Sequence, residues 1–283
     1  MSLLVFGKTG QVARELARRA PGADVLGRDA ADLSQPEACA AMILERQPAA
    51  VINAAAWTAV DKAETERDAA FVINAQAPAA MARACAALGV PFVHISTDYV
   101  FDGSGDRPWR PDDPTGPLGV YGQSKLAGEE AVARAGGTWA VLRTSWVFSA
   151  HGVNFVKTML RLSDTRDAIS VVADQIGGPT PAGDIAAACL TIAKTLTSDP
   201  SKSGVYHFSG APDASWADFA REVFQQARRP VAVTDIPSEA YPTPAPRPRN
   251  SRLDCSTTKT VFGIDRPDWR AGLAAVLDEL AQA

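Results

Sequence analysis

Short, nearly continuous apolar runs alternate with longer amphipathic stretches through the first half of the chain. Apolar runs without alternation are typical of parallel strands that are covered on both faces. The strands they predict are residues 3–6, 24–27, 50–53, 91–96 and 139–143. The stretches between them predict helices at 11–19, 35–46, 61–73, 75–88 and 121–134. This alternation predicts an α/β fold, a doubly wound (Rossmann) parallel sheet with right-handed crossovers.

The rhythm loosens after residue 149. The elements expected there are strands at 169–172 and 205–208 and helices at 154–162, 181–196, 216–226, 257–262 and 269–281. A proline-rich stretch, residues 237–248, is expected to be an ordered loop or lid without regular structure. We therefore expect a dinucleotide-binding domain at 1–148, to which the chain returns within 165–208. A smaller substrate-binding domain is expected at 149–283.

Composition narrows the class of protein. The chain has 283 residues, of which 46% are hydrophobic and 21% charged, as in globular proteins. The net charge of −4 and the lack of a basic stripe argue against a nucleic-acid partner. No apolar run approaches the ~20 residues that span a membrane, and the apolar start reads as a strand rather than a signal peptide. Four scattered cysteines predict reduced thiols and a cytoplasmic location, and three scattered histidines predict no zinc site.

A glycine-containing turn follows the first predicted strand directly. Gly7 and Gly10 belong to this turn, and Gln11 and Val12 open the next helix. Glycines let the backbone approach a pyrophosphate closely, and the helix N-terminus attracts the phosphate charge. The spacing is tighter than Gly-x-Gly-x-x-Gly, so the turn alone fits either a dinucleotide site or an ordinary glycine turn.

The end of the second predicted strand bears on the choice of dinucleotide. An acidic residue at this position suits a free ribose 2′-hydroxyl, and an arginine accommodates a 2′-phosphate. Here Arg28 precedes Asp29, which favours NADPH and leaves NADH possible. Asp32 and Leu33 are expected beside the adenine.

Tyr121 and Lys125 lie four residues apart in a predicted helix and therefore on one face of it. A free tyrosine has a pKa near ~10, and a nearby ammonium group favours the phenolate and lowers that pKa. Such a tyrosine can give its proton to a carbonyl oxygen as hydride reaches the carbon. Thr97 ends the fourth predicted strand, and its hydroxyl is suited to hold the same oxygen, with Ser96 as the alternative.

Together these motifs resemble the extended short-chain dehydrogenase/reductase family. The strings that carry the resemblance are GKTGQV (7–12), NAAAWTAVDKAE (53–64), STDYVFDG (96–103), YGQSKLAGE (121–129), RTSWVF (143–148), NFVKTMLRL (154–162) and YPTPAPRPRNSRL (241–253). They are distributed along most of the chain, from residue 7 to residue 253, and they are most similar to members that reduce a 4-keto nucleotide sugar. The resemblance implies reduction of dTDP-4-dehydro-β-L-rhamnose to dTDP-L-rhamnose, a step in making rhamnose-containing lipopolysaccharide, by hydride transfer from NADPH in a pocket between two domains.

The resemblance also implies roles for individual residues by matching position. The catalytic residues it implies are Thr97, Tyr121 and Lys125. The cofactor contacts are Gly10, Gln11, Val12, Ala56, Trp57 and Thr58, besides the catalytic tyrosine and lysine. The substrate contacts are Val60, Thr97, Asp98 and Trp146. From their chemistry, Arg247, Arg249 and Arg252 are expected either to neutralise the substrate's pyrophosphate or to lie on a solvated lid.

Some relatives are described as dimers bridged by a metal ion that glutamates on three segments hold. Glu15 matches the first segment, but residues 181–184 contain no glutamate. We therefore expect no metal site, with Glu15 on the surface. Dependence on Mg²⁺ and the choice between monomer and homodimer stay open.

Other activities share parts of this pattern. The family's dehydratases place Asp-Glu directly after the threonine, whereas Thr97 is followed here by Asp98 and Tyr99, so a 4,6-dehydratase is not expected. Another nucleotide-sugar reductase or an epimerase remains an alternative, because both use the Tyr/Lys pair. A non-catalytic, NADP-binding regulatory subunit of the same fold is the alternative from another class. Such proteins often lose the tyrosine or the lysine, and both are present here.

Overall fold

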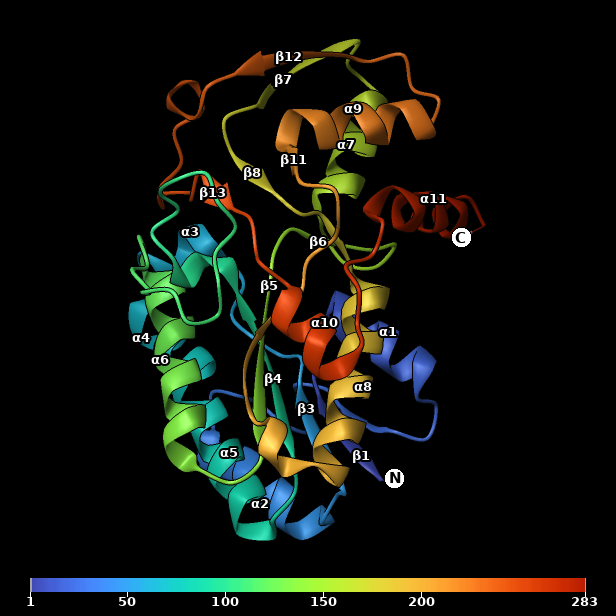
Figure 1. Cartoon of the computed structure of the whole chain (residues 1–283). Coiled ribbons are helices and arrows are strands. Elements are labelled where there is room, and N and C mark those ends of the chain that lie inside the picture. The colour runs from blue at the N-terminus through green and yellow to red at the C-terminus, as the bar shows by residue number, and fades with distance from the viewer. Residues whose placement is uncertain (1, 283) are drawn as a thin grey trace.

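A six-stranded parallel sheet forms the centre of the molecule, a computed structural model that describes residues 2–282 (Figure 1). Its order is β10-β5-β4-β3-β1-β2. The strands are β1 (Leu3–Phe6), β2 (Asp24–Leu26), β3 (Ala50–Asn53), β4 (Phe92–Thr97), β5 (Trp139–Thr144) and β10 (Gly204–His207). The order of strands reverses between β1 and β3, and ligands of such sheets bind at the carboxyl ends of the strands beside a reversal of this kind.

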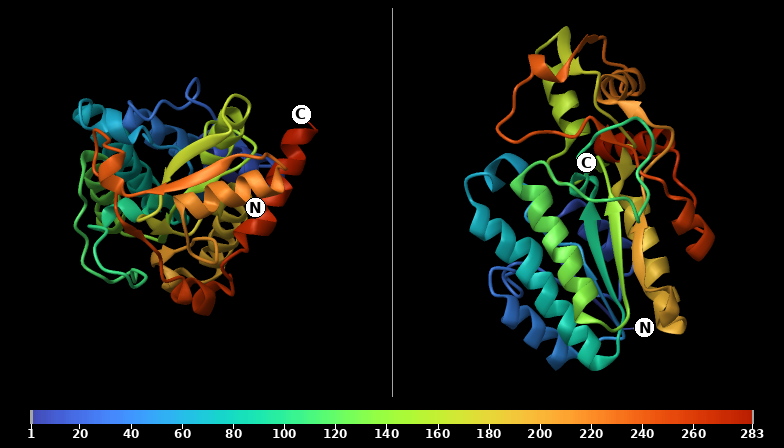
Figure 2. Two further views of the ribbon diagram at one scale, coloured as in Figure 1. Left: turned by 90° about the horizontal axis from the view of Figure 1, so that it is seen from above. Right: turned by 60° about the vertical axis from the view of Figure 1, so that its left-hand side comes forward.

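Helices cover both faces of this sheet (Figure 2). On one face lie α2 (Pro36–Arg46), α5 (Ala77–Leu88) and α6 (Val120–Ala135). On the other lie α1 (Gln11–Arg19), α8 (Ala182–Ser198) and α10 (Ser256–Phe262). Because both faces are covered, residues of β1 and β3 are buried without alternation, which explains the continuous apolar runs. The predicted α/β fold is confirmed, and its strands and helices in the first half match within about two residues, with one exception.

The exception is the helix expected at 61–73. It is divided into α3 (Val60–Ala63), α4 (Arg67–Phe71) and a π-helical turn, η1 (Val72–Gln76). Within η1, the side chain of Asn74 points inward. It accepts a hydrogen bond from the backbone N–H of Trp57 at 2.8 Å and donates to the carbonyl of the same residue at 3.1 Å. The wider turn thus ties the segment after β3 to the helical layer, a link that hydrophobic periodicity does not reveal.

The C-terminal region has its own core. Apolar side chains of α7 (Phe155–Ser163), β7 (Ala168–Val172), α9 (Trp216–Gln226) and α11 (Trp269–Ala281) pack together there. β12 (Ala232–Ile236) pairs with β7. The sequence did not predict this strand or the two-residue strands β6 (Val147–Phe148), β8 (Ile176–Gly177), β9 (Thr180–Pro181), β11 (Ala214–Ser215) and β13 (Asn250–Ser251). Such short strands pair with partners far along the chain and leave no local periodicity.

The proline-rich segment 237–248 is a loop apart from one 3₁₀ turn, η4 (Ser238–Ala240), so the expectation that it lacks regular structure is wrong at that turn. The chain does return to the main sheet, with α8 covering it and β10 at its edge. The division of the chain at residue 148 remains a prediction. None of the helices within residues 2–282 is both long and apolar enough to cross a membrane.

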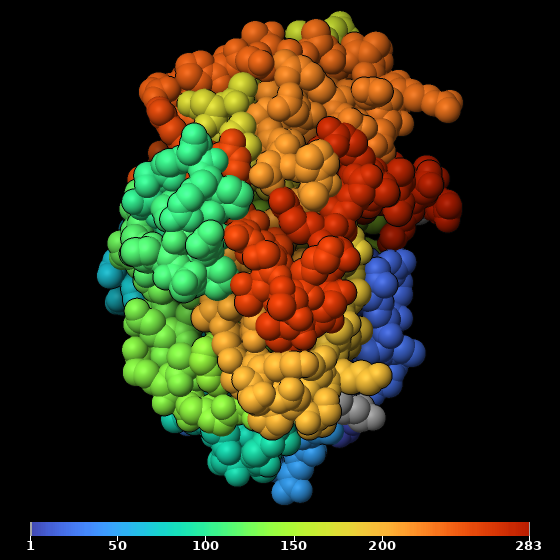
Figure 3. All heavy atoms as spheres, viewed as in Figure 1, coloured from blue at the N-terminus to red at the C-terminus, as the bar shows by residue number. Residues whose placement is uncertain are grey.

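A long loop, residues 102–118, lies against the C-terminal segment around residue 253 (Figure 3). The Trp109 backbone N–H donates to the carbonyl of Arg252 at 2.9 Å. A buried ion pair holds the base of the loop: Arg143 on β5 contacts Glu129 on α6 at 2.6 Å and donates to the Pro111 carbonyl at 3.2 Å. The loop is therefore fixed both to the sheet and to the segment that borders the cleft.

Candidate active site

A cleft of about 740 Å³ opens at the carboxyl ends of β1, β3, β4 and β5. Most of the predicted site residues line it: Gly7, Gly10, Gln11, Val12, Arg28, Asp32, Leu33, Ala56, Thr58, Val60, Thr97, Asp98, Tyr121, Lys125 and Trp146. Lining residues for which no role was predicted include Thr9, Asn53, Tyr99, Thr144, Ser145 and Val153. Several of these stand at or just after the end of a strand. Their position at the sheet's carboxyl edge was the available signal.

The turn after β1 forms the floor at one end of the cleft. Gly7 has φ = +108°, and a Cβ there would lie 3.2 Å from the backbone of Ala54, so a side chain would be strained and crowded. Gly10 is the N-cap of α1, and no side chain of the described residues caps this helix. The first N–H groups of α1 are therefore left for a ligand, and such groups bind phosphate.

Gln11 contributes its backbone rather than its side chain to this end of the cleft. The Gln11 Oε1 atom accepts hydrogen bonds from the Ser149 hydroxyl at 3.1 Å and from the Asn154 amide at 3.0 Å. The side chain thus joins α1 to the segment after β6.

At the outer end of the cleft, the Arg28 side chain is 81% exposed and its Nε lies 3.3 Å from Asp32 Oδ2. Arg28 is therefore free to turn toward a phosphate group.

Tyr121 and Lys125 lie on the first turns of α6, which is held firmly at its start. Glu64 accepts a hydrogen bond from the backbone N–H of Val120 at 2.8 Å. At Gly122 a Cβ would lie 2.2 Å from the Tyr99 carbonyl oxygen, so only glycine permits this packing. The Tyr121 ring meets the Tyr99 ring edge-on, with centroids 5.4 Å apart. These contacts orient Tyr121 toward the cleft.

The expected pKa of Tyr121 is wrong in direction. Burial raises the pKa of Tyr121 to about 12, with the Asp98 carboxylate adding to the rise and a hydrogen bond from Thr97 opposing it. Burial also lowers the pKa of Lys125 to about 8, opposed by the charge of Glu129. Loss of hydration is the largest cause of both shifts, and spacing along a helix does not reveal it. The raised pKa keeps the phenol protonated, the form that a proton donor requires.

Three buried polar atoms around the cleft lack a hydrogen-bond partner among the described residues. They are Asp98 Oδ2, in the 3₁₀ turn η2 (Asp98–Val100), Ser96 Oγ at the end of β4, and Thr144 Oγ1 at the end of β5. The other oxygen of Asp98 accepts a bond from the Thr97 hydroxyl at 3.1 Å, and burial raises the pKa of Asp98 to about 6. Buried groups without partners are costly, so these three point to a polar ligand that completes them.

Trp146 forms the wall of the cleft on the side of the C-terminal region. Its φ of +49° is rare for a bulky residue and points to a local constraint. The ring stacks on Trp216 with centroids 3.6 Å apart. A Cβ on Gly177 would lie 2.8 Å from the Trp146 ring, so a glycine beneath makes room for the stack. The wall is therefore a rigid apolar surface suited to the face of a sugar.

Three predicted contacts do not reach the cleft. Trp57 is not among the residues that line the cleft; its backbone bonds to Asn74, and its indole N–H donates to the Ala59 carbonyl at 3.0 Å. Arg247 is paired with Asp61 at 2.9 Å and borders a smaller cavity of about 230 Å³. Arg252 donates to Asn250 Oδ1 at 3.1 Å.

The third arginine of that stretch, Arg249, is ion-paired with Glu239. All three arginines thus already have acceptors within the protein. In this structure their guanidinium groups contact acceptors of the protein, and their contact with a pyrophosphate stays a prediction.

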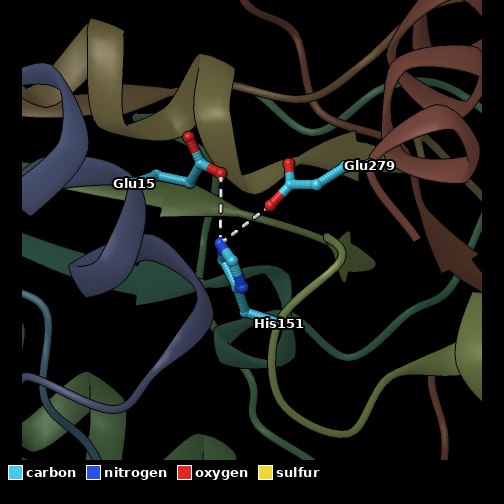
Figure 4. A group of neighbouring side chains, drawn as sticks. All are labelled: Glu15, His151 and Glu279. Atoms are coloured by element: carbon cyan, nitrogen blue, oxygen red, sulfur yellow. Dashed lines mark ion pairs between the residues drawn. The ribbon is translucent and has the colours of Figure 1, made fainter. Parts of the chain in front are cut away.

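The expectation that Glu15 lies on the surface is wrong. Its side chain is buried, and Arg18 contacts it at 2.7 Å. His151 lies 3.8 Å from Glu15 and 3.3 Å from Glu279 of α11 (Figure 4). The ligand atoms of Glu15, His151 and Glu279 lie within 4.8 Å of one another, as in a candidate cation site. The cluster joins α1, the segment after β6 and α11.

Comparisons with known proteins agree with this site. The family model described as "RmlD substrate binding domain" matches residues 1–282. A dTDP-4-dehydrorhamnose reductase of Sinorhizobium fredii is 49% identical over 278 residues, covering 95% of this chain and 94% of the relative. The reductase of the same name from Escherichia coli K12 is 42% identical over 293 residues, covering 99% and 98%.

Solved structures give the same result. A dTDP-4-dehydrorhamnose reductase from Clostridium acetobutylicum superposes with a TM-score of 0.92 at 35% identity, covering 99% of this chain and 100% of that one. A Bacillus anthracis reductase of that name, in complex with NADP, gives a TM-score of 0.91 at 34% identity with the same coverage. With its full length matched and its glycine turn and Tyr/Lys helix in one cleft, the chain belongs to the RmlD family of dTDP-4-dehydrorhamnose reductases.

Proposed function

We propose that this chain reduces dTDP-4-dehydro-β-L-rhamnose to dTDP-L-rhamnose with NADPH. The observation that carries the proposal is the convergence of Tyr121 and Lys125 on the cleft that begins at the Gly7 turn. The names of the relatives supply the sugar and the nucleotide. The full-length relatives are named as reductases, and this chain has both the tyrosine and the lysine, which favours an enzyme over a regulatory subunit.

The cleft fits a dinucleotide with a 2′-phosphate. The Gly7 turn and the uncapped start of α1 suit the pyrophosphate, and Arg28 suits the 2′-phosphate. The relative from Bacillus anthracis, solved with NADP, supports this choice. When bound, NADPH supplies the hydride. We assign it to residues 1–148 together with α8 and β10, and the sugar nucleotide to the region that follows residue 148.

Tyr121 acts as the proton donor. Its Oη–H bond breaks as the oxygen of the substrate's 4-keto group gains a proton and becomes a hydroxyl. The high pKa of the phenol keeps this proton in place until negative charge develops on the ketone oxygen. Thr97, whose hydroxyl faces the same cleft, orients that oxygen. The positive charge of Lys125 then stabilises the phenolate that remains.

Asp98, Val60 and Trp146 are assigned to the sugar. Asp98 Oδ2 has no hydrogen-bond partner among residues 2–282 and is therefore free to accept a bond from a sugar hydroxyl. The indole of Trp146 offers an apolar face, held by its stack on Trp216. Much of the rate enhancement should come from placing the ketone against the hydride donor and Tyr121 in one fixed geometry.

The experiment is NADPH oxidation followed at its near-ultraviolet absorbance with dTDP-4-dehydro-β-L-rhamnose as substrate. Turnover to dTDP-L-rhamnose, identified by chromatography against a standard, is expected. A matched reaction with the UDP-linked sugar tests the nucleotide, and one with the D-gluco 4-keto sugar tests the configuration. Tight NADPH binding without turnover of any of the three would overturn the proposal in favour of a regulatory subunit.

A further inference from the structure

A chain of three buried polar side chains runs from the sheet to Lys125. Asn53 ends β3, His94 lies within β4, and Lys125 reaches down from α6. Their exposed fractions are 1%, 0% and 1%. In the parallel register Asn53 stands opposite His94. Asn53 Nδ2 lies 3.1 Å from His94 Nδ1, and Lys125 Nζ lies 3.2 Å from His94 Nε2.

The backbone fixes the orientation of the Asn53 amide. Asn53 Oδ1 accepts a hydrogen bond from the N–H of Ala55 at 3.1 Å, which turns the NH₂ group toward His94. An amide nitrogen can only donate, so His94 Nδ1 must be the acceptor. In a neutral imidazole the single proton then resides on Nε2. Burial and the charge of Lys125 lower the pKa of His94, so the ring is neutral.

This tautomer presents a donor to Lys125. The Nε2–H bond points at Nζ, and an ammonium group has three donors and no acceptor. Only the neutral amine offers a lone pair to that N–H. The Ile95 carbonyl, 2.7 Å from Nζ, accepts a bond from either form. When Lys125 is protonated, the Nε2–H of His94 therefore faces another donor, whereas the neutral amine accepts a hydrogen bond from it.

We propose that Asn53 and His94 are positioning residues that hold a hydrogen-bond donor against Lys125 and so favour release of its proton. The inference rests on the proposed function, in which Lys125 serves Tyr121. Two causes favour loss of the proton from Lys125. One is burial, which acts on any lysine at this depth, and the other is the fixed tautomer of His94, which substitutions can remove.

Other charged groups near Lys125 do not replace this contact. Glu129, one turn further along α6, attracts the ammonium, but its carboxylate is engaged by Arg143 from β5. Tyr121, Tyr99 and Asp98 lie toward the cleft and are buried acids with raised pKa values. Within residues 2–282, the polar contacts of Nζ are with His94 and Ile95.

The first test needs no variant and no substrate. Nitrogen NMR of the free protein labelled at histidine distinguishes a protonated ring nitrogen from an unprotonated one. We expect His94 to carry its proton on Nε2 and to keep Nδ1 unprotonated around neutral pH. The His94→Phe spectrum, which lacks these signals, assigns them. A proton on Nδ1 instead would overturn the proposal.

The second test is the pH dependence of kcat at saturating NADPH and sugar. In the wild type, kcat should fall as pH rises through about 8, where Lys125 loses its proton. His94→Phe removes the facing donor, and Asn53→Asp accepts from Nδ1–H and so turns Nε2 into an acceptor. Both should move the fall to a pH about one unit higher. Phe92→Leu, which changes the packing against the His94 ring and leaves the hydrogen bonds of His94 in place, should leave it unmoved.

An unchanged fall in both variants would contradict the proposal, and the two variants guard against a fold defect in either one. Carbon NMR of labelled lysine in the free protein measures the same shift for Lys125 directly, with Lys125→Met to assign the signal. If the wild type shows no turnover but this titration still moves, the proposed function fails while the tautomer assignment stands.

Discussion

The two ends of the cleft are built in different ways. The end that we assign to the dinucleotide (the dinucleotide end) consists of strand termini and backbone groups: the Gly7 turn, the first N–H groups of α1 and the ends of β3 and β4. The end that we assign to the sugar (the sugar end) depends on side chains that meet across long stretches of sequence, such as the stack of Trp146 on Trp216. The register of one sheet determines where the groups of the first end lie. Pairwise contacts between distant segments determine where the side chains of the second end lie.

This difference assigns chemistry and specificity to different parts. Burial between β4 and α6 fixes the reactive groups and sets their pKa values, so substitutions there should act on kcat. Contacts from the proline-rich segment 237–248 to α3 are polar and partly exposed, so substitutions there should act on substrate affinity. Predictions below test this division.

The largest effect is expected for Tyr121→Phe. Loss of the proton donor should lower kcat by about a thousandfold, within the range of general acid catalysis, while the Kd for NADPH stays nearly unchanged. Steady-state kinetics and fluorescence titration with NADPH measure the two quantities. Tyr99→Phe, the same change on the neighbouring ring of the cleft, is the control. If Tyr99→Phe were the variant that lost turnover, the assignment of the donor would be wrong.

Glu129→Gln should lower the free energy of unfolding. Arg143 would keep its buried charge without a full partner, which costs about 3 kcal/mol in unfolding free energy. Urea denaturation followed by circular dichroism measures this. Glu130→Gln changes the next residue, whose pair with Arg134 is exposed, and should cost well under 1 kcal/mol. Equal losses in both variants would show that the ion pair does not hold the loop 102–118 to the sheet.

Local pattern predicted the dinucleotide end well. Apolar runs located β1, β3 and β4, and the ends of these strands placed the Gly7 turn and Thr97 in one cleft. The four-residue spacing of Tyr121 and Lys125 held on α6. Local pattern did not predict the pKa shifts of these two side chains, because the shifts come from desolvation, which depends on the layers that cover the helix.

Long-range partners limited prediction at the sugar end. The arginines of segment 237–248 look available in sequence, yet Arg247 finds Asp61 across 186 positions. The backbone of Trp57 is bonded to Asn74, which lies 17 positions further along. In the sequence His94 is one residue within a mostly apolar run. Its proposed role as a positioning residue follows only from the strand register, which places it opposite Asn53. Each case depends on a contact for which the chain gives no periodic signal.

Arg28→Ala tests the dinucleotide end at its exposed margin. The KM for NADPH should rise about tenfold, because an exposed charge-assisted contact with the 2′-phosphate is lost, while the KM for NADH should hardly change. The measured quantity is the ratio of kcat/KM for the two cofactors. Arg46→Ala, which removes an arginine paired with Asp24 away from the cleft, is the control. An unaltered ratio in Arg28→Ala would remove Arg28 from the cofactor site.

The smallest effect is expected at the sugar end, for Asp61→Asn. Asp61 Oδ1 accepts bonds from the Ala245 N–H at 3.1 Å and from Arg247 at 2.9 Å, and so ties segment 237–248 to α3. The pair is partly exposed, so its loss should cost less than about 1 kcal/mol and raise the KM for the sugar about threefold with kcat retained. Asp235→Asn breaks an exposed pair with Arg221 elsewhere in the C-terminal region and should leave both constants unchanged. A fall in kcat at constant KM would mean that this segment acts on the chemistry at Tyr121, and the proposed division between the two ends of the cleft would not hold.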